Sequence, residues 1–170
     1  MRERSEPPLT IRRLDVGEHA LLRALRLRAL ERSPGAFGDR LEEEREREET
    51  WWVRLAASVS EPGPHAAFIA ELDGAPVGMA YGLIDAERAD GVRVGGMWVD
   101  AGARRRGVGA ALLTSALRWG EAQGRAHAGL WAPAHAAGAL QLYQRFGFQP
   151  TGESRVLRPE LTILAFVRPG

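Results

Sequence analysis

The sequence predicts an α/β or α+β fold, in which helices pack on the faces of one sheet. Segments with the two-residue period of half-buried strands alternate with segments of helical period along the 170 residues. Hydrophobic residues make up 45% of the chain, which is enough for a packed core of ordinary size. The sequence contains no internal repeat and no linker, so we expect residues 1–170 to form one domain.

The first predicted elements are a strand and a helix. Residues 1–8 are polar and end in two prolines, and we expect them to form a flexible N-terminus. Apolar and polar residues alternate over 9–14, which predicts a strand. The period becomes helical over 17–32, and Pro34 lies where this helix should stop.

A second helix is expected over residues 40–58, whose first half is almost entirely charged. Opposite charges three or four residues apart, Glu43 with Arg47 and Glu42 with Arg45, would support this helix. We interpret the acidic run mainly as a solvated, salt-bridged face. Attraction of a cationic amine is the alternative.

A hairpin follows the second helix. Apolar residues alternate over 68–72 and 77–83, and Asp73-Gly74 between them is a strong signal for a two-residue turn. Another strand is predicted over 92–99.

The last part of the chain alternates helices and strands. A helix is predicted over 107–123 and is closed by Gly124, and a second over 135–146 is closed by Gly147. The predicted strands of this part are 127–132, 148–155 and 161–167. The whole chain therefore reads β-α-α-β-β-β-α-β-α-β-β.

Composition excludes several classes of function. A net charge of +1 argues against a nucleic-acid binder. The absence of cysteine excludes disulfides, thiolate metal sites and cysteine nucleophiles, and the four histidines lie too far apart to predict a metal site. The N-terminus has no apolar signal region, and the longest uncharged stretch, 126–144, is too polar and broken to span a membrane. We therefore expect a cytoplasmic protein with no membrane partner.

The strongest local motif lies between the strand at 92–99 and the helix at 107–123. It reads Arg104-Arg105-Arg106-Gly107-Val108-Gly109-Ala110. The free N–H groups of a helix start, glycines that let the backbone approach an anion, and flanking arginines together suit a phosphate or diphosphate. The third glycine of a dinucleotide-binding fingerprint and the lysine of a P-loop are both missing. A solvated basic turn is the alternative interpretation.

The residues around this motif extend the pattern. Met97-Trp98-Val99-Asp100 comes directly before it, and Leu142-Tyr143 and Gly147-Phe148 follow downstream. Together these residues resemble motif A and the downstream pattern of the GNAT superfamily of acyl-CoA N-acyltransferases. The order of elements over residues 9–167 is also similar to that family.

The resemblance implies a mixed, mostly antiparallel central sheet of about seven strands with splayed middle strands, flanked by about four helices. It also implies an N-acetyltransferase that uses acetyl-CoA as cosubstrate and transfers the acetyl group to a primary amine by direct attack. The acceptor would be a small amine, an amino acid or a peptide N-terminus. The cofactor-binding residues implied are Met97, Trp98, Val99, Arg104, Arg105, Arg106, Gly107, Val108, Gly109, Ala110 and His135.

Two of the implied roles have specific chemistry. Tyr143 would be the catalytic residue that protonates the leaving thiolate, because its ordinary pKa of about 10 lies close to the value of about 8.5 for a thiol. A ring packed in the core is the alternative for this tyrosine. His135 stands where family members often have asparagine, and its ring can likewise donate and accept hydrogen bonds.

The sequence assigns neither a base nor an acceptor site firmly. The strand at 92–99 holds no acidic residue, so Asp100, Glu71, the glutamates of 42–49 and a chain of waters all stay open as the base. Phe37, Trp51 and Tyr81 are candidates to line the acceptor site, or are packing residues of the core.

Other functions and assemblies stay open as well. The same chemistry with a longer acyl-CoA is one alternative, and a non-catalytic CoA-binding module is another. A homodimer is possible, with the strand at 161–167 as the surface expected to pair.

Overall fold

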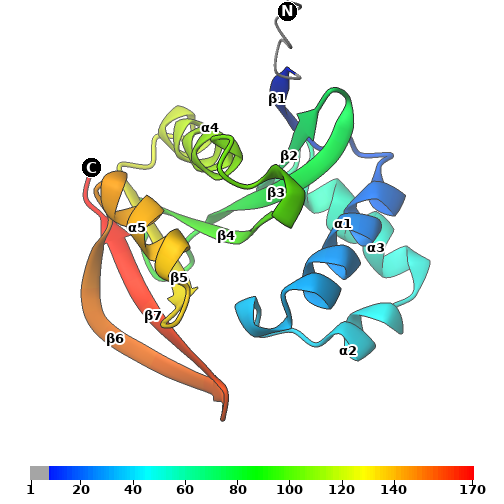
Figure 1. The fold of residues 1–170 in the computed structure, drawn as a ribbon. Coiled ribbons are helices and arrows are strands. Elements are labelled where there is room, and N and C mark those ends of the chain that lie inside the picture. The colour runs from blue at the N-terminus through cyan, green and yellow to red at the C-terminus, as the bar shows by residue number, and fades with distance from the viewer. Residues whose placement is uncertain (1–7) are drawn as a thin grey trace, which may run out of the picture.

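The computed structural model describes residues 8–170, so the predicted flexible segment 1–8 lies, apart from Pro8, outside the described residues. Seven strands form one sheet in the order β1-β2-β3-β4-β5-β7-β6 (Figure 1). The strands are β1 (Leu9–Arg13), β2 (Ala66–Leu72), β3 (Ala75–Ile84), β4 (Gly91–Val99), β5 (His127–Pro133), β6 (Gln149–Arg158) and β7 (Leu161–Arg168). The helices are α1 (His19–Arg32), α2 (Leu41–Arg45), α3 (Glu49–Val59), α4 (Val108–Ala122) and α5 (Ala137–Arg145), with short 3-10 turns η1 (Pro34–Ala36) and η2 (Ala101–Ala103). Strands β4 and β5 pair in parallel and their neighbours pair antiparallel, which confirms the predicted fold class.

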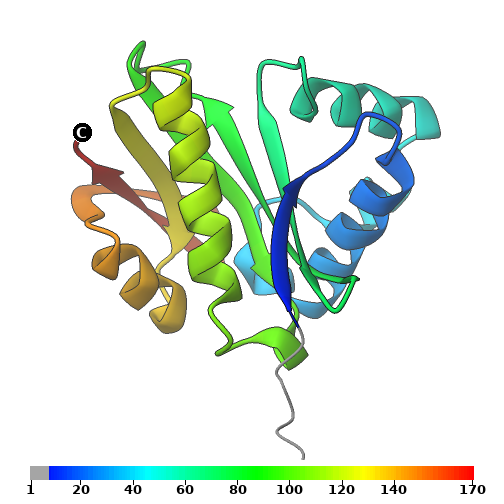
Figure 2. The same cartoon turned by 90° about the horizontal axis from the view of Figure 1, so that it is seen from above.

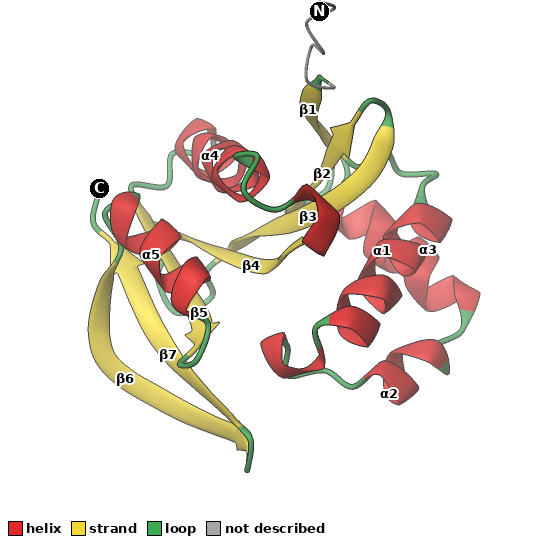
Figure 3. Ribbon diagram, in the orientation of Figure 1, coloured by secondary structure: helices red, strands yellow, loops and turns green. Residues whose placement is uncertain are grey.

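Helices cover both faces of the sheet. Figures 2 and 3 show α4 and α5 on one face and α1 with α3 on the other. Alternation along the strands produces this division, because successive side chains point to opposite faces. On β2, Phe68 belongs to the core under α4, whereas Ile69 belongs to the core under α1 and α3. Within residues 8–170, no helix has both the length and the apolar character needed to cross a membrane.

The sheet splays between β4 and β5. The two strands pair only from Gly91 with His127 to Arg93 with Gly129. Beyond Arg93 the edge of β4 that faces β5 has no strand partner among residues 8–170, and the two strands diverge in Figure 1. The splayed middle strands that the resemblance implies are therefore present.

An irregularity in β4 lies beside this opening. The register with β3 shifts between Met79, which pairs with Trp98, and Tyr81, which pairs with Gly95. Gly96 lies inside the shift with a φ of +56°, a value that glycine adopts without steric penalty. An extra residue on one strand bends it, so this bulge contributes to the splay.

The hairpin turn at Asp73-Gly74 forms as predicted. Both residues have positive φ, +51° and +77°, as a turn of type I′ requires. Leu72 pairs with Ala75 directly across the turn. The turn type therefore follows from two adjacent residues.

The prediction of one helix over 40–58 is wrong. Residues 46–48 separate α2 from α3, and Glu48 takes an extended backbone with φ −65° and ψ 153°. Glutamates four residues apart in this run, such as Glu42 with Glu46, repel each other and weaken a continuous helix. The break leaves both short helices packed on α1.

The predicted charge pairs of this segment are also wrong. Arg47 pairs with Glu44 at 2.8 Å, and Arg45 lies 3.8 Å from Glu31 of α1. The other glutamates of the run are exposed, as a solvated face requires, but Glu44 is only 3% exposed. A buried carboxylate is costly unless it is paired, so the Arg47 contact is part of the reason that Glu44 can face inward.

The strand at 161–167 does not offer a free edge for a second copy of the chain. It forms β7, which pairs with β5 on one side and with β6 on the other. The sequence does not show which of the last two strands lies at the edge of the sheet. The pairing places β6 at the edge and β7 between β5 and β6. The expectation that this strand pairs between subunits is therefore wrong.

Candidate active site

The segment before α4 has the backbone of a candidate anion cradle. Arg105 has a φ of +62° and Gly107 a φ of +75°, so the chain twice adopts the left-handed conformation within three residues. Alternation of this kind turns successive N–H groups toward one concave side. Gly107 occupies the N-cap position of α4 and makes no side-chain cap. The first-turn N–H groups of a 15-residue helix are therefore available to an anion.

The two glycines of this motif serve different purposes. A Cβ added at Gly107 would have no heavy atom within 4 Å, so the positive φ is what favours glycine there. A Cβ at Gly109 would lie 3.3 Å from Leu142 Cδ2 of α5, so glycine lets the start of α4 approach α5 closely. The arginines at 104, 105 and 106 are all exposed beside this backbone.

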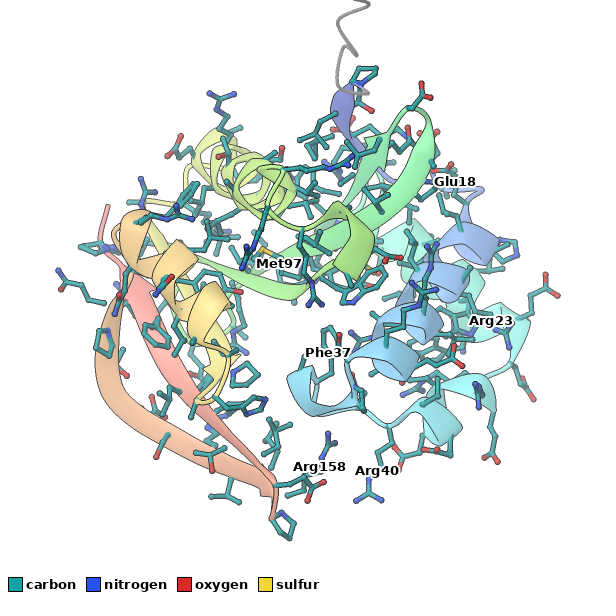
Figure 4. The ribbon with its side chains drawn as sticks, viewed as in Figure 1. Glu18, Arg23, Phe37, Arg40, Met97 and Arg158 are labelled. Atoms are coloured by element: carbon teal, nitrogen blue, oxygen red, sulfur yellow. The ribbon has the colours of Figure 1, made fainter. Side chains whose placement is uncertain are left out.

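The open edge of β4 leads into this cradle. Met97 and Val99 lie on the part of β4 beyond its last pair with β5, and their side chains pack against the core under α4. Arg104 Nε donates to the Val99 carbonyl at 3.1 Å. A ligand that pairs with this carbonyl has to share it with Arg104 or displace that side chain. Figure 4 shows Met97 beneath α4 and Phe37 near the loop after α1.

Trp98 lies differently from its two neighbours. It pairs with Met79, is 4% exposed and belongs to the core under α1 and α3. The Arg28 guanidinium lies 5.8 Å from its ring centroid. Its side chain therefore points to the opposite face from Met97 and Val99, and we leave Trp98 out of the cofactor site proposed below.

Tyr143 has its ring in the core. It is 7% exposed and meets Phe148 edge to face, with centroids 6.1 Å apart. Burial raises the pKa of Tyr143 to about 12, so the phenol stays protonated at neutral pH. The ring of Tyr143 therefore packs in the core, as the alternative interpretation predicted. The hydroxyl group keeps its proton at neutral pH.

The two tyrosines, Tyr81 and Tyr143, make stability sensitive to high pH. Burial raises the pKa of each to about 12, compared with about 10 in an unfolded chain. The unfolded state therefore releases these protons first, and stability is lost as pH rises above 10. At pH 11 each tyrosine should lower the free energy of unfolding by about 1.4 kcal/mol. Urea unfolding of wild type and Tyr143→Phe from pH 9 to 11 measures this, and equal slopes for both proteins would contradict it.

His135 and Phe37 lie near the loop that follows α1. His135 is exposed and precedes α5, which begins only at Ala137. A Cβ added at Gly35 would lie 3.6 Å from His135 Nε2, so this ring faces the loop after α1. Phe37 is 9% exposed beneath the Arg26 guanidinium, 4.9 Å from its ring centroid.

Trp51 and Tyr81 line a cavity of about 350 Å³ on the other face of the sheet from α4. Its walls come from α1, α2, α3 and β3, and it is a half-open pocket. Its lining is Arg26, Asp39, Glu44, Arg47, Trp51, Trp52, Leu55, Ser58, Val59, His65, Tyr81 and Leu83. The structure therefore brings together two of the three predicted acceptor residues, while Phe37 contacts the cavity only through Arg26.

This cavity meets the bulge of β4 at Tyr81. A Cβ added at Gly96 would lie 2.3 Å from Tyr81 Cδ2, so the ring lies directly on the glycine backbone. The tyrosine that closes one end of the cavity therefore touches the splayed strand.

The candidate bases differ in their surroundings. Arg28 and Arg32 of α1 hold Asp100, and Arg12 holds Glu71 at 3.0 Å. Glu44 is the carboxylate of the run 42–49 that is buried, and it lines the cavity. No sequence pattern distinguishes Glu44, because Glu42 and Glu43 also have an arginine three or four residues later.

The comparisons with known proteins agree with this geometry. The sequence profile of the acetyltransferase (GNAT) family matches residues 23–148. An uncharacterized N-acetyltransferase of Methanocaldococcus jannaschii is 28% identical over 103 residues, which cover 58% of this chain and 44% of that protein. The chain thus matches less than half of this relative's length.

Solved structures share the fold. A GNAT-family acetyltransferase from Streptococcus pneumoniae superposes with a TM-score of 0.79 at 18% identity, covering 95% of this chain and 99% of that one. YncA, a putative acetyltransferase from Salmonella typhimurium solved with its cofactor acetyl-CoA, gives 0.76 at 15% identity, covering 95% and 94%. The profile spans most of the chain, from α1 through the cradle to Phe148, and the chain therefore belongs to the acetyltransferase (GNAT) family.

Proposed function

We propose that this protein, acting as one domain, transfers the acetyl group of acetyl-CoA to a primary amine by direct attack. The proposal rests on two features that are neighbours along the chain, an open strand edge and a free helix start. Residues 100–107, with η2 and three exposed arginines, connect the open end of β4 to the uncapped N-terminus of α4. A strand edge suits an extended, amide-containing arm, and the cradle suits a diphosphate. The similar fold solved with acetyl-CoA supports this choice of cosubstrate.

The chain offers distinct groups to each part of the cosubstrate. The arginines at 104–106 and the N–H groups from Gly107 to Ala110 would hold the diphosphate. The backbone of Met97 and Val99 would pair with the pantetheine arm along the open edge. His135, between β5 and α5, would approach the same arm from the far side of the opening.

Acetyl-CoA supplies an acetyl group activated as a thioester. A backbone N–H of β4 near Val99 would donate to the carbonyl oxygen as negative charge develops there. Tyr143 would donate its proton to the departing sulfur. Its pKa of about 12 keeps that proton in place until the thiolate forms, although the transfer is harder than from an ordinary phenol.

We assign no protein base. Asp100 and Glu71 are each engaged by arginine, so neither is free to take a proton without loosening an ion pair. The glutamates of 42–49 and a chain of waters stay open as acceptors of the amine proton.

Thermal unfolding with acetyl-CoA, CoA, ATP and NAD at matched concentrations tests the cosubstrate. A ligand present at about 100 times its Kd should stabilise the fold by about 2.7 kcal/mol, which raises Tm by several degrees. We expect a shift with acetyl-CoA and CoA only. Release of CoA thiol with a panel of primary amines then tests turnover. Binding without turnover for any amine would favour a non-catalytic CoA-binding module.

Removing charge from the cradle tests where the cosubstrate binds. The double variant Arg105→Gln/Arg106→Gln should raise the Kd for CoA about tenfold or more, because charge-assisted hydrogen bonds to phosphate are lost. Arg118→Gln, an exposed arginine further along α4, is the matched control and should leave Kd unchanged. Titration calorimetry measures both. Equal effects of the two variants would indicate nonspecific attraction and would contradict the assigned cradle.

A further inference from the structure

We propose that the cavity between α3 and β3 is the acceptor site, and that it selects a primary amine with one positive charge and an apolar or aromatic body. This inference rests on the proposed function and specifies its acceptor.

The position of the cavity suits an attacking amine. Tyr81 belongs both to the cavity wall and to the contact with Gly96 on the bulge of β4. An amine at the Tyr81 end therefore lies beside the strand whose open edge would hold the thioester. Tyr81 stays neutral there, because burial raises its pKa to about 12.

The charges of the cavity gather at this same end and cancel. Arg26 pairs with Asp39 at 2.5 Å, and Arg47 pairs with Glu44 at 2.8 Å. Arg26, Glu44 and Asp39 line the cavity together with Tyr81 and lie close enough to act electrostatically on it. In these pairs Glu44 uses Oε1 and Asp39 uses Oδ2, so each carboxylate keeps its second oxygen for another donor. One ammonium group fits such a set, because it donates to these oxygens without separating either pair.

The remaining walls of the cavity are mostly apolar, and Ser58 and His65 are their polar members. Leu83 lies two residues beyond Tyr81 on β3 and pairs with Arg93, where β4 is still joined to β5. The other apolar walls come from α3 and are Trp52, Leu55 and Val59. His65 Nδ1 accepts the Ile84 N–H at 3.2 Å, so the ring carries its proton on Nε2 and can donate to a neutral oxygen or ring.

This division predicts which acceptors fit. A hydrophobic body can fill the end at Leu83 while its amine stays at Tyr81. A second ammonium group at the apolar end would be buried without a carboxylate, which is strongly unfavourable. Polycationic amines should therefore be poor acceptors, despite the acidic run on α2.

A comparison of amines tests the selection. We expect 2-phenylethylamine to have a kcat/KM at least about tenfold above that of 1,5-diaminopentane, since a hydrophobic pocket discriminates by factors of this size. Ethylamine, which has the amine without the body, should be acetylated with a higher KM. Preference for the diamine would overturn the proposal.

Two variants locate the pocket. Leu55→Trp fills the apolar end and should lower kcat/KM for 2-phenylethylamine about tenfold or more, with little change for ethylamine. Leu21→Trp is the matched control, because Leu21 is also partly buried on this side of the sheet but lies outside the cavity. Glu44→Gln should instead raise KM for both amines. Equal losses for both amines in Leu55→Trp, or no loss, would overturn the assignment.

Binding measurements separate this inference from the proposed function. Calorimetry of 2-phenylethylamine with the CoA-bound wild type and the CoA-bound Leu55→Trp variant requires no turnover. Binding that Leu55→Trp removes would support the acceptor pocket even without catalysis. Turnover of ethylamine without binding or turnover of 2-phenylethylamine would support the transferase and overturn the pocket.

Discussion

Replacement of Tyr143 by phenylalanine is expected to lower kcat about 100-fold or more, because general acid help to a leaving group typically contributes 10²–10⁴ in rate. The ring is 7% exposed and packs against Phe148, and phenylalanine preserves that packing. The Kd for CoA and the Tm at neutral pH should therefore stay near the wild-type values. Steady-state kinetics with thermal unfolding measures all three quantities.

The pH dependence of the wild type provides a second check on this role. Since the pKa of Tyr143 is raised to about 12, its proton is present throughout the range from pH 7 to 10. Ionisation of Tyr143 should therefore cause no fall in kcat on the alkaline side below pH 10. Phe146→Leu, a change to a partly buried neighbour in the same core, is a control for general disturbance. Unchanged turnover in Tyr143→Phe would refute the assigned role and leave the tyrosine as a packing residue.

Gly96→Ala is expected to destabilise the protein by about 2–5 kcal/mol and to disrupt the proposed acceptor cavity. The added Cβ would lie 2.3 Å from Tyr81 Cδ2 and 2.6 Å from Cε2, and the residue would keep a φ of +56°. A left-handed backbone costs a residue with a Cβ about 1–2 kcal/mol, and overpacking adds about 1–3 kcal/mol. Because the ring must move away from β4, the KM for the amine should also rise.

Gly95→Ala is the matched control for this substitution. Gly95 is the adjacent residue on β4, and a Cβ there would meet no heavy atom within 4 Å. Denaturant unfolding and amine kinetics on both variants measure the difference. If the two variants had the same stability, the contact between Tyr81 and Gly96 would not be needed to shape the cavity.

The sequence by itself determined those features whose cause lies within a few adjacent residues. Asp73-Gly74 specifies the turn between β2 and β3 because both residues accept positive φ. Gly107 and its arginines likewise specify the cradle, since the helix start and the flanking charges are contiguous in the chain. Alternation and helical period also placed all seven strands in their correct order along the chain.

Only the tertiary structure decided how distant segments combine. The burial of Glu44 depends on Arg47 close by and on Tyr81 of β3, nearly forty residues away, and no local pattern distinguishes it from the exposed glutamates around it. Likewise, the position of β7 between β5 and β6 is determined by which strands it pairs with, and the residues of β7 alone do not predict it. Periodicity reports which face of an element is apolar, whereas a cavity forms from the shapes of several faces once they pack. The backbone of the proposed cradle could therefore be predicted from the sequence, and the cavity proposed as the acceptor site could not.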